Sequence, residues 1–120
     1  MPEPTVLDVR TARDWEAWLE RNHDAAPEIW LRLFNKNAPE PGVPYGEAVE
    51  VALCFGWIDS LTRRYDEVSR IQRFSPRKAK SAWSRSNAER VQRLVEAGRM
   101  RAPGQRQIDA AKAAGRWPVG

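Results

Sequence analysis

A change of hydrophobic period at Gly56 constrains the fold of this chain more than any other feature of its sequence. Over residues 45–55 the apolar residues recur at helical spacing, whereas residues 57–65 and 68–75 are rich in Ile, Thr, Tyr, Phe and Arg. Only the dipeptide at 66–67 separates the two later runs, so they predict a β-hairpin. The fold must therefore place a helix directly before a pair of antiparallel strands.

Caps and spacing predict three further helices. Thr11 with an acidic residue three positions later resembles a capping box, and it begins a predicted helix at about 11–22. A second helix is expected from Ser84 or Ser86 to Gly98, and a third from about 103 to 114. Pro44 suits the first position of the helix before Gly56.

Residues 28–35 predict one further strand. Ile29, Leu31 and Leu33 share one face of it, and Trp30, Arg32 and Phe34 share the other. We therefore expect one α+β domain over residues 1–120. It has a small antiparallel sheet, made of a strand at about 28–35 and a hairpin at about 57–75, packed by about four helices.

The composition argues against several classes of protein. The 120 residues include one Cys and one His, which excludes an internal disulfide and argues against a zinc site. The longest strictly apolar run, at 51–55, is far too short to span a membrane. No signal-peptide pattern opens the chain. We therefore expect a cytoplasmic protein with no metal, no cofactor and no integral membrane association.

Charge is concentrated in the second half of the chain. Residues 1–56 hold 5 basic and 10 acidic residues, residues 57–101 hold 12 and 5, and residues 102–120 hold 3 and 1. A segment with a net charge of +7 suggests an anionic partner, of which nucleic acid is the most obvious. The alternative is a solvated basic surface that only aids solubility.

The segment 57–90 carries the residues that we expect to bind such a ligand: Trp57, Asp59, Arg73, Phe74, Arg77, Trp83, Ser84 and Asn87. If the hairpin folds back, Arg73 approaches Asp59 across the strands. Arg77 and Ser84 then lie near the start of the next helix, whose free N–H groups suit an oxyanion. The rings of Trp57, Phe74 and Trp83 offer faces for stacking. The prediction is a recess where guanidinium groups and aromatic rings meet.

Each of these residues also has an ordinary structural role open to it. Asp59 and Arg73 suit a cross-strand ion pair, Trp57 a core anchor, and Ser84 and Asn87 helix caps. Catalytic signatures are lacking in the sequence: it has no Gly-rich phosphate loop and no nucleophile elbow. Cys54 falls in an apolar helical run, which favours a buried, inert thiol.

Several strings resemble one known family, the YdeI/OmpD-associated proteins. They are Ala52–Asp59, Gln72–Arg77, Ser81–Asn87, Glu96–Met100, Trp15–Leu19 and Tyr45–Ala48. The resemblance spans roughly residues 5–117. It implies a bacterial protein linked to bacteriocin protection and tolerance of antimicrobial peptides, with no established catalytic mechanism. Many members continue into a further helical region that this sequence does not contain.

Three hypotheses follow for the function. The first is a non-enzymatic domain that binds an anionic ligand, with nucleic acid as one candidate, through the basic face at 57–90. The second is a small-molecule or enzymatic pocket around Asp59, Arg73 and Asn87. The third, implied by the resemblance, is a protein-interaction domain in envelope stress. We favour the first, because the segment interleaves aromatic residues with its excess of arginine.

Overall fold

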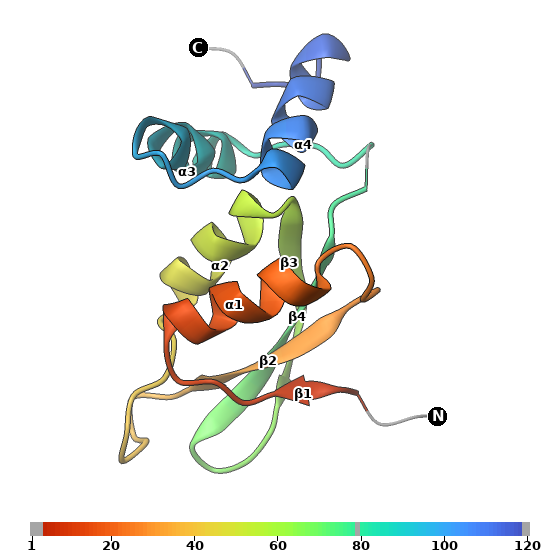
Figure 1. Ribbon diagram of the computed structural model, residues 1–120. Coiled ribbons are helices and arrows are strands. Elements are labelled where there is room, and N and C mark those ends of the chain that lie inside the picture. The colour runs from red at the N-terminus through yellow and green to blue at the C-terminus, as the bar shows by residue number, and fades with distance from the viewer. Residues whose placement is uncertain (1–3, 79, 119–120) are drawn as a thin grey trace.

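The computed structural model describes residues 4–78 and 80–118, which form a sheet and a set of helices (Figure 1). In chain order the elements are β1 (Val6–Leu7), α1 (Ala12–Asn22), β2 (Ile29–Phe34), α2 (Tyr45–Cys54), β3 (Trp57–Arg64), β4 (Ser69–Pro76), α3 (Arg85–Glu96) and α4 (Ala102–Ala113). The four predicted helices, the strand and the hairpin are all confirmed. The α+β class is therefore correct.

The sheet is mixed, and the prediction of a purely antiparallel sheet is wrong. Its order is β1-β2-β4-β3, in which β2–β4 and β4–β3 pair antiparallel. The short edge strand β1 pairs parallel to β2, with Val6 opposite Trp30. Two residues are too few to show a period, so β1 leaves no signal in the sequence.

The helices lie on one side of the sheet or beyond its end. Figure 1 shows α1 and α2 in front of the strands, and α3 and α4 past the end opposite the hairpin turn. Trp15 of α1 packs its ring 5.1 Å from that of Phe74 on β4 and donates its indole N–H to the Ala48 carbonyl of α2 at 3.0 Å. This buried tryptophan joins both helices to the sheet.

Alternation along the strands separates two faces. Ile29, Leu31 and Leu33 belong to the core with Phe74, which stands opposite Ile29. The intervening residues of β2 therefore point to the other face, away from α1 and α2. None of the described helices covers that face (Figure 1).

Helix ends follow the predicted caps with one exception. Thr11 Oγ1 accepts from the Asp14 N–H at 3.1 Å, and Ser84 Oγ accepts from the Asn87 N–H at 3.0 Å. Pro44 is the N-cap of α2 rather than its first helical residue, because its ψ of 142° is extended. Gly56, with φ of +75°, makes the tight passage from α2 into β3.

Candidate functional site

Two of the predicted stacking residues belong to the core. Trp57 is 1% exposed and Phe74 is fully buried. The Trp57 indole N–H donates to the carbonyl of His23 at 3.2 Å, and its ring meets that of Trp18 edge-on. Neither ring offers a face to a ligand, so their prediction as stacking platforms is wrong. Their bulk closes the space between the helices and the sheet instead.

The predicted approach of Arg73 to Asp59 is also wrong. Asp59 stands opposite Phe74 in the β3–β4 register, and Arg73 points to the opposite face of the sheet. Arg73 Nε donates to Glu28 Oε1 at 2.8 Å, and Asp59 Oδ2 accepts from the Tyr45 hydroxyl. A pocket built from Asp59, Arg73 and Asn87 together is therefore excluded.

Arg77 and Trp83 do meet, but in a closed loop. The Arg77 guanidinium lies 3.9 Å above the centre of the Trp83 ring, and its Nη2 donates to the carbonyls of Ser81 and Ala82, both at 3.3 Å. Arg77 is 7% exposed, and burial lowers the pKa of its guanidinium. The Nη2 donors of Arg77 are therefore occupied by carbonyls of the loop before α3, and the Ser84 hydroxyl is occupied as the cap of α3. Neither side chain is free to form the anion site that was expected at the start of α3.

Asn87 has a local partner. Its side-chain oxygen accepts from Arg90 Nη1 at 3.1 Å within α3. Arg90 also acts electrostatically on the Tyr45 hydroxyl, which donates to Asp59. Burial, followed by this hydrogen bond, raises the pKa of Tyr45 to about 12. Asp59 thus has its hydrogen-bond partner on α2, whereas that of Asn87 lies within α3.

Arginines and aromatic rings gather on the uncovered side of the sheet, which we call the open face. It is formed by alternate residues of the four strands: Val6, Trp30, Arg32, Phe34, Ile58, Arg63, Ser69, Ile71, Arg73 and Ser75. The Arg63 guanidinium lies 5.6 Å from the centre of the Trp30 ring, and that of Arg32 lies 4.5 Å from the centre of Phe34. Of the predicted site residues, Arg73 alone lies here.

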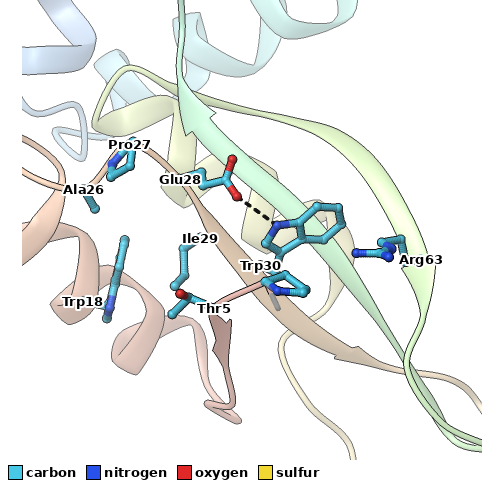
Figure 2. Close-up of a pocket in the computed structure, with 9 residues that line it drawn as sticks. Thr5, Trp18, Ala26, Pro27, Glu28, Ile29, Trp30 and Arg63 are labelled. Atoms are coloured by element: carbon cyan, nitrogen blue, oxygen red, sulfur yellow. Dashed lines mark hydrogen bonds between the residues drawn. The ribbon is translucent and has the colours of Figure 1, made fainter. Parts of the chain in front are cut away.

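Two adjoining pockets open along this face. The first, of about 570 Å³, lies at the start of β2 and reaches from Trp18 on the helix side to Glu28, Trp30 and Arg63 (Figure 2). The second, of about 480 Å³, lies against Ile71 and is lined by Arg63, Arg64 and Tyr65 together with Pro4 and Val6. Pro4 and Arg63 line both, so the two pockets adjoin, and we call them together the groove.

Glu28 is the carboxylate of the first pocket. Its Oε2 accepts from the Trp30 indole N–H at 3.1 Å, and its Oε1 accepts from Arg73 Nε at 2.8 Å (Figure 2). The hydrogen bond from Arg73 holds the pKa of Glu28 below its usual value. Glu28 is therefore an ionised acceptor with a fixed orientation at neutral pH.

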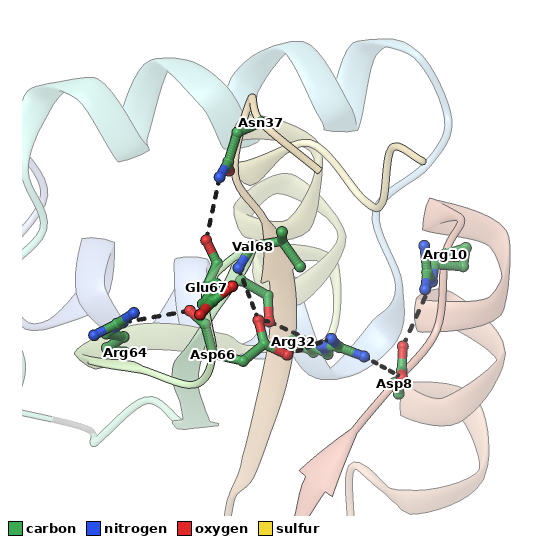
Figure 3. A network of polar contacts seen from close by, with 9 residues as sticks. Asp8, Arg10, Arg32, Asn37, Arg64, Asp66, Glu67 and Val68 are labelled. Atoms are coloured by element: carbon green, nitrogen blue, oxygen red, sulfur yellow. Dashed lines mark hydrogen bonds and ion pairs between the residues drawn. The ribbon is translucent and has the colours of Figure 1, made fainter. Parts of the chain in front are cut away.

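A network around Arg32 braces the hairpin turn beside the second pocket (Figure 3). Arg32 donates to Asp8 at 2.8 Å and to Asp66 at 2.7 Å, and Asp66 also accepts from the Val68 N–H and the Ser69 hydroxyl. The bonds from Ser69 and Val68 lower the pKa of Asp66. The network fixes the turn that begins at Tyr65, directly after the two arginines at the end of β3.

The groove provides exposed cations next to an exposed ring. Tyr65 is 49% exposed, and both Arg63 and Arg64 are exposed. Among residues 4–78 and 80–118, no carboxylate lies within ion-pair distance of either arginine. Within the same ranges no group of His, Cys, Asp or Glu side chains could hold a metal ion.

The sequence predicted Arg73 at the site but missed Trp30, Arg63 and Tyr65. The alternation of residues 29–34 already put Trp30 on the face opposite Leu31. What it did not show is that only one face receives helices. The charge excess of 57–101 includes Arg63. However, the predicted site consisted of residues around tryptophan and phenylalanine, which are distinctive in the sequence, and Arg63 has no such neighbour.

Fold and groove together define a class: an α+β domain whose helices cover one face of a mixed four-stranded sheet and whose other face carries a basic and aromatic groove. The chain belongs to the DUF8412 family, a domain of unknown function, whose model matches residues 7–107. No curated protein and no solved structure matches it. The family description gives no function, so the resemblance to YdeI/OmpD-associated proteins stays a prediction.

Proposed function

We propose that this domain binds single-stranded nucleic acid in the groove of its open face, without catalysis. The observation that carries the proposal is the half-exposed ring of Tyr65 beside Arg63 and Arg64, two exposed arginines that line the same pocket. Proteins that bind single strands combine cations for the phosphates with aromatic rings for the bases.

The shape of the groove supports a flexible strand rather than a rigid duplex. Its two pockets lie along a sheet face, and its arginines come from one strand, β3, instead of from a helix that could enter a major groove. A single strand can turn its bases toward the sheet while its phosphates meet Arg63 and Arg64. The braced turn around Arg32 keeps Tyr65 in place for stacking.

Fluorescence anisotropy tests the proposal. Labelled single-stranded and duplex oligonucleotides, DNA and RNA, are titrated with protein at 20 and at 200 mM salt. We expect the single strands to bind more tightly, and to weaken as salt rises because binding releases counterions. An absence of single-strand binding at 20 mM salt would remove the proposed function.

Matched variants locate the surface. Arg63→Ala with Arg64→Ala should weaken binding and reduce the slope of log K against log salt by about 0.7 for each phosphate that the variant no longer neutralises. Tyr65→Ala should cost about 1–3 kcal/mol of binding energy, because the ring that stacks on a base is removed. Arg106→Ala is the control, since this exposed arginine lies on α4, beyond the far end of the sheet.

No helix among residues 4–78 and 80–118 is long and apolar enough to cross a membrane.

The resemblance to YdeI/OmpD-associated proteins adds a cellular setting to the proposal: a cytoplasmic domain acting in bacterial stress or in tolerance of antimicrobial peptides. A deletion strain tested for sensitivity to such peptides addresses that setting separately from the binding itself.

A further inference from the structure

We propose that the first pocket takes an unpaired guanine, whose Watson–Crick edge is read by the carboxylate of Glu28. This inference rests on the proposed function, because the guanine is one base of the bound strand. It adds a sequence preference that phosphate contacts and stacking alone do not provide.

Glu28 is built to accept further hydrogen bonds. The Trp30 N–H and Arg73 Nε each take one position on its two oxygens, at 3.1 and 2.8 Å. A carboxylate has about four lone-pair positions, so two remain. The Glu28 side chain is 38% exposed and lines the pocket, next to Pro27 and Ile29 (Figure 2). Its two partners fix its orientation before any ligand arrives.

The charge around Glu28 favours a neutral donor over a cation. Arg73 already balances the carboxylate, and the exposed Arg63 lines the same pocket. A cationic ligand would therefore meet little net attraction there. A neutral group with two adjacent N–H donors gains both hydrogen bonds without that repulsion.

Among the common bases only guanine presents two adjacent donors on this edge, N1–H and the 2-amino group. Adenine, cytosine, uracil and thymine each place an acceptor in at least one of these positions, so a lone pair would face the carboxylate. With any of these bases the carboxylate forgoes the two hydrogen bonds that guanine offers, so the complex is weaker. A good bidentate contact to a base corresponds to roughly 10-fold to 100-fold in affinity.

Two indole rings line the pocket, Trp18 half-buried and Trp30 6% exposed. In Figure 2 the ring of Trp18 stands on one side of the pocket and that of Trp30 on the other, with Ile29 between them. Arg63 lies beyond Trp30, toward the second pocket, where it can meet the phosphate of the same nucleotide. The base must be unpaired, because pairing would occupy the edge that Glu28 reads.

Labelled pentadeoxynucleotides test the inference by changing the ligand rather than the protein. The probe TTGTT is compared with TTATT, TTCTT and TTTTT by anisotropy at 20 mM salt. One guanine in each strand prevents quadruplex formation. We expect TTGTT to bind at least 10-fold more tightly than the other three. Replacing its guanine by hypoxanthine, which lacks the 2-amino group, should remove most of that preference, whereas 7-deazaguanine, which keeps the edge, should retain it.

Glu28→Gln supplies the protein side of the test. It should reduce the preference for TTGTT over TTTTT to less than 3-fold, with the melting temperature confirming that the variant is folded. The ratio of the two affinities is the readout, because loss of the carboxylate charge beside Arg73 strengthens the binding of every oligonucleotide. Equal binding of all four pentamers by the native protein would overturn the guanine inference and leave the proposed function standing. Binding of none would overturn both.

Discussion

The guanidinium of Arg77 lies 3.9 Å above the ring of Trp83, and the two close the loop between the hairpin and α3. Arg77 is buried, and its Nε has no hydrogen-bond partner among the described residues. A buried cation is tolerated only where other groups replace its water. Here the ring of Trp83 and the carbonyls of Ser81 and Ala82 do so.

A double-mutant cycle measures this interaction. Trp83→Leu keeps an apolar side chain but removes the ring, and Arg77→Met keeps the aliphatic stem but removes the charge. We expect the two changes to couple by about 1–2 kcal/mol in the free energy of unfolding, because either change alone already abolishes the desolvated cation–π interaction. Urea unfolding of the four proteins gives this value. Additive effects within about 0.3 kcal/mol would show that the stacking does not stabilise the loop.

The second prediction compares two glycines, one in a helix contact and one with open space around it. A Cβ added at Gly104 of α4 would stand 2.5 Å from the Cys54 carbonyl oxygen and 2.6 Å from that of Leu53. A Cβ added at Gly46 of α2 would meet nothing within 4 Å. The close approach of α4 to the end of α2 thus requires the missing side chain.

Gly104→Ala should therefore lower the free energy of unfolding by about 1–3 kcal/mol, since backbone atoms of the two helices must separate. Gly46→Ala should raise it by about 0.4–1 kcal/mol, because alanine reduces the entropy of the unfolded chain. Thermal and urea unfolding of both variants check the pair. Destabilisation by Gly46→Ala as large as that by Gly104→Ala would contradict the packing argument.

Helices were predicted correctly where apolar residues recur at helical spacing. Trp15 and Leu19, or Val91 and Leu94, recur at the spacing of one helix face, and the structure buries all four. Such periodicity follows from which side meets the core, so the sequence alone reveals it. β1 was not predicted, because a strand of two residues is too short to show a periodic pattern. Its pairing with β2 also depends on the position of the whole sheet.

The candidate site was harder to predict because face and register decide it. A register shift between Asp59 and Thr62 accompanies a bulge in β3, and one residue of difference moves a side chain to the opposite face. Arg73 was expected near Asp59 from the folding back of the hairpin alone, but the observed register places Phe74 opposite Asp59 and turns Arg73 toward Glu28. Rare residue types also misled: Trp57 and Phe74 are distinctive in the sequence because they fill the core.

The last prediction concerns Tyr45, whose hydroxyl donates to Asp59. Burial and then this bond raise the pKa of Tyr45 to about 12. In the unfolded chain a tyrosine titrates near 10. The folded state therefore holds the proton more strongly, so the contribution of Tyr45 to stability is complete below about pH 10 and is lost as pH rises through about 12.

Absorbance at 295 nm follows this titration in the Tyr65→Phe variant, where Tyr45 is the only tyrosine left in the sequence. We expect a midpoint near 12 while circular dichroism still reports a folded chain. Adding Asp59→Asn should lower the midpoint, though not to 10, because the partial desolvation of the hydroxyl remains and only the carboxylate is removed. Tyr45 is 43% exposed, so only part of its ring is removed from water. A midpoint near 10 with Asp59 intact would show that neither this partial desolvation nor the bond to Asp59 holds the proton.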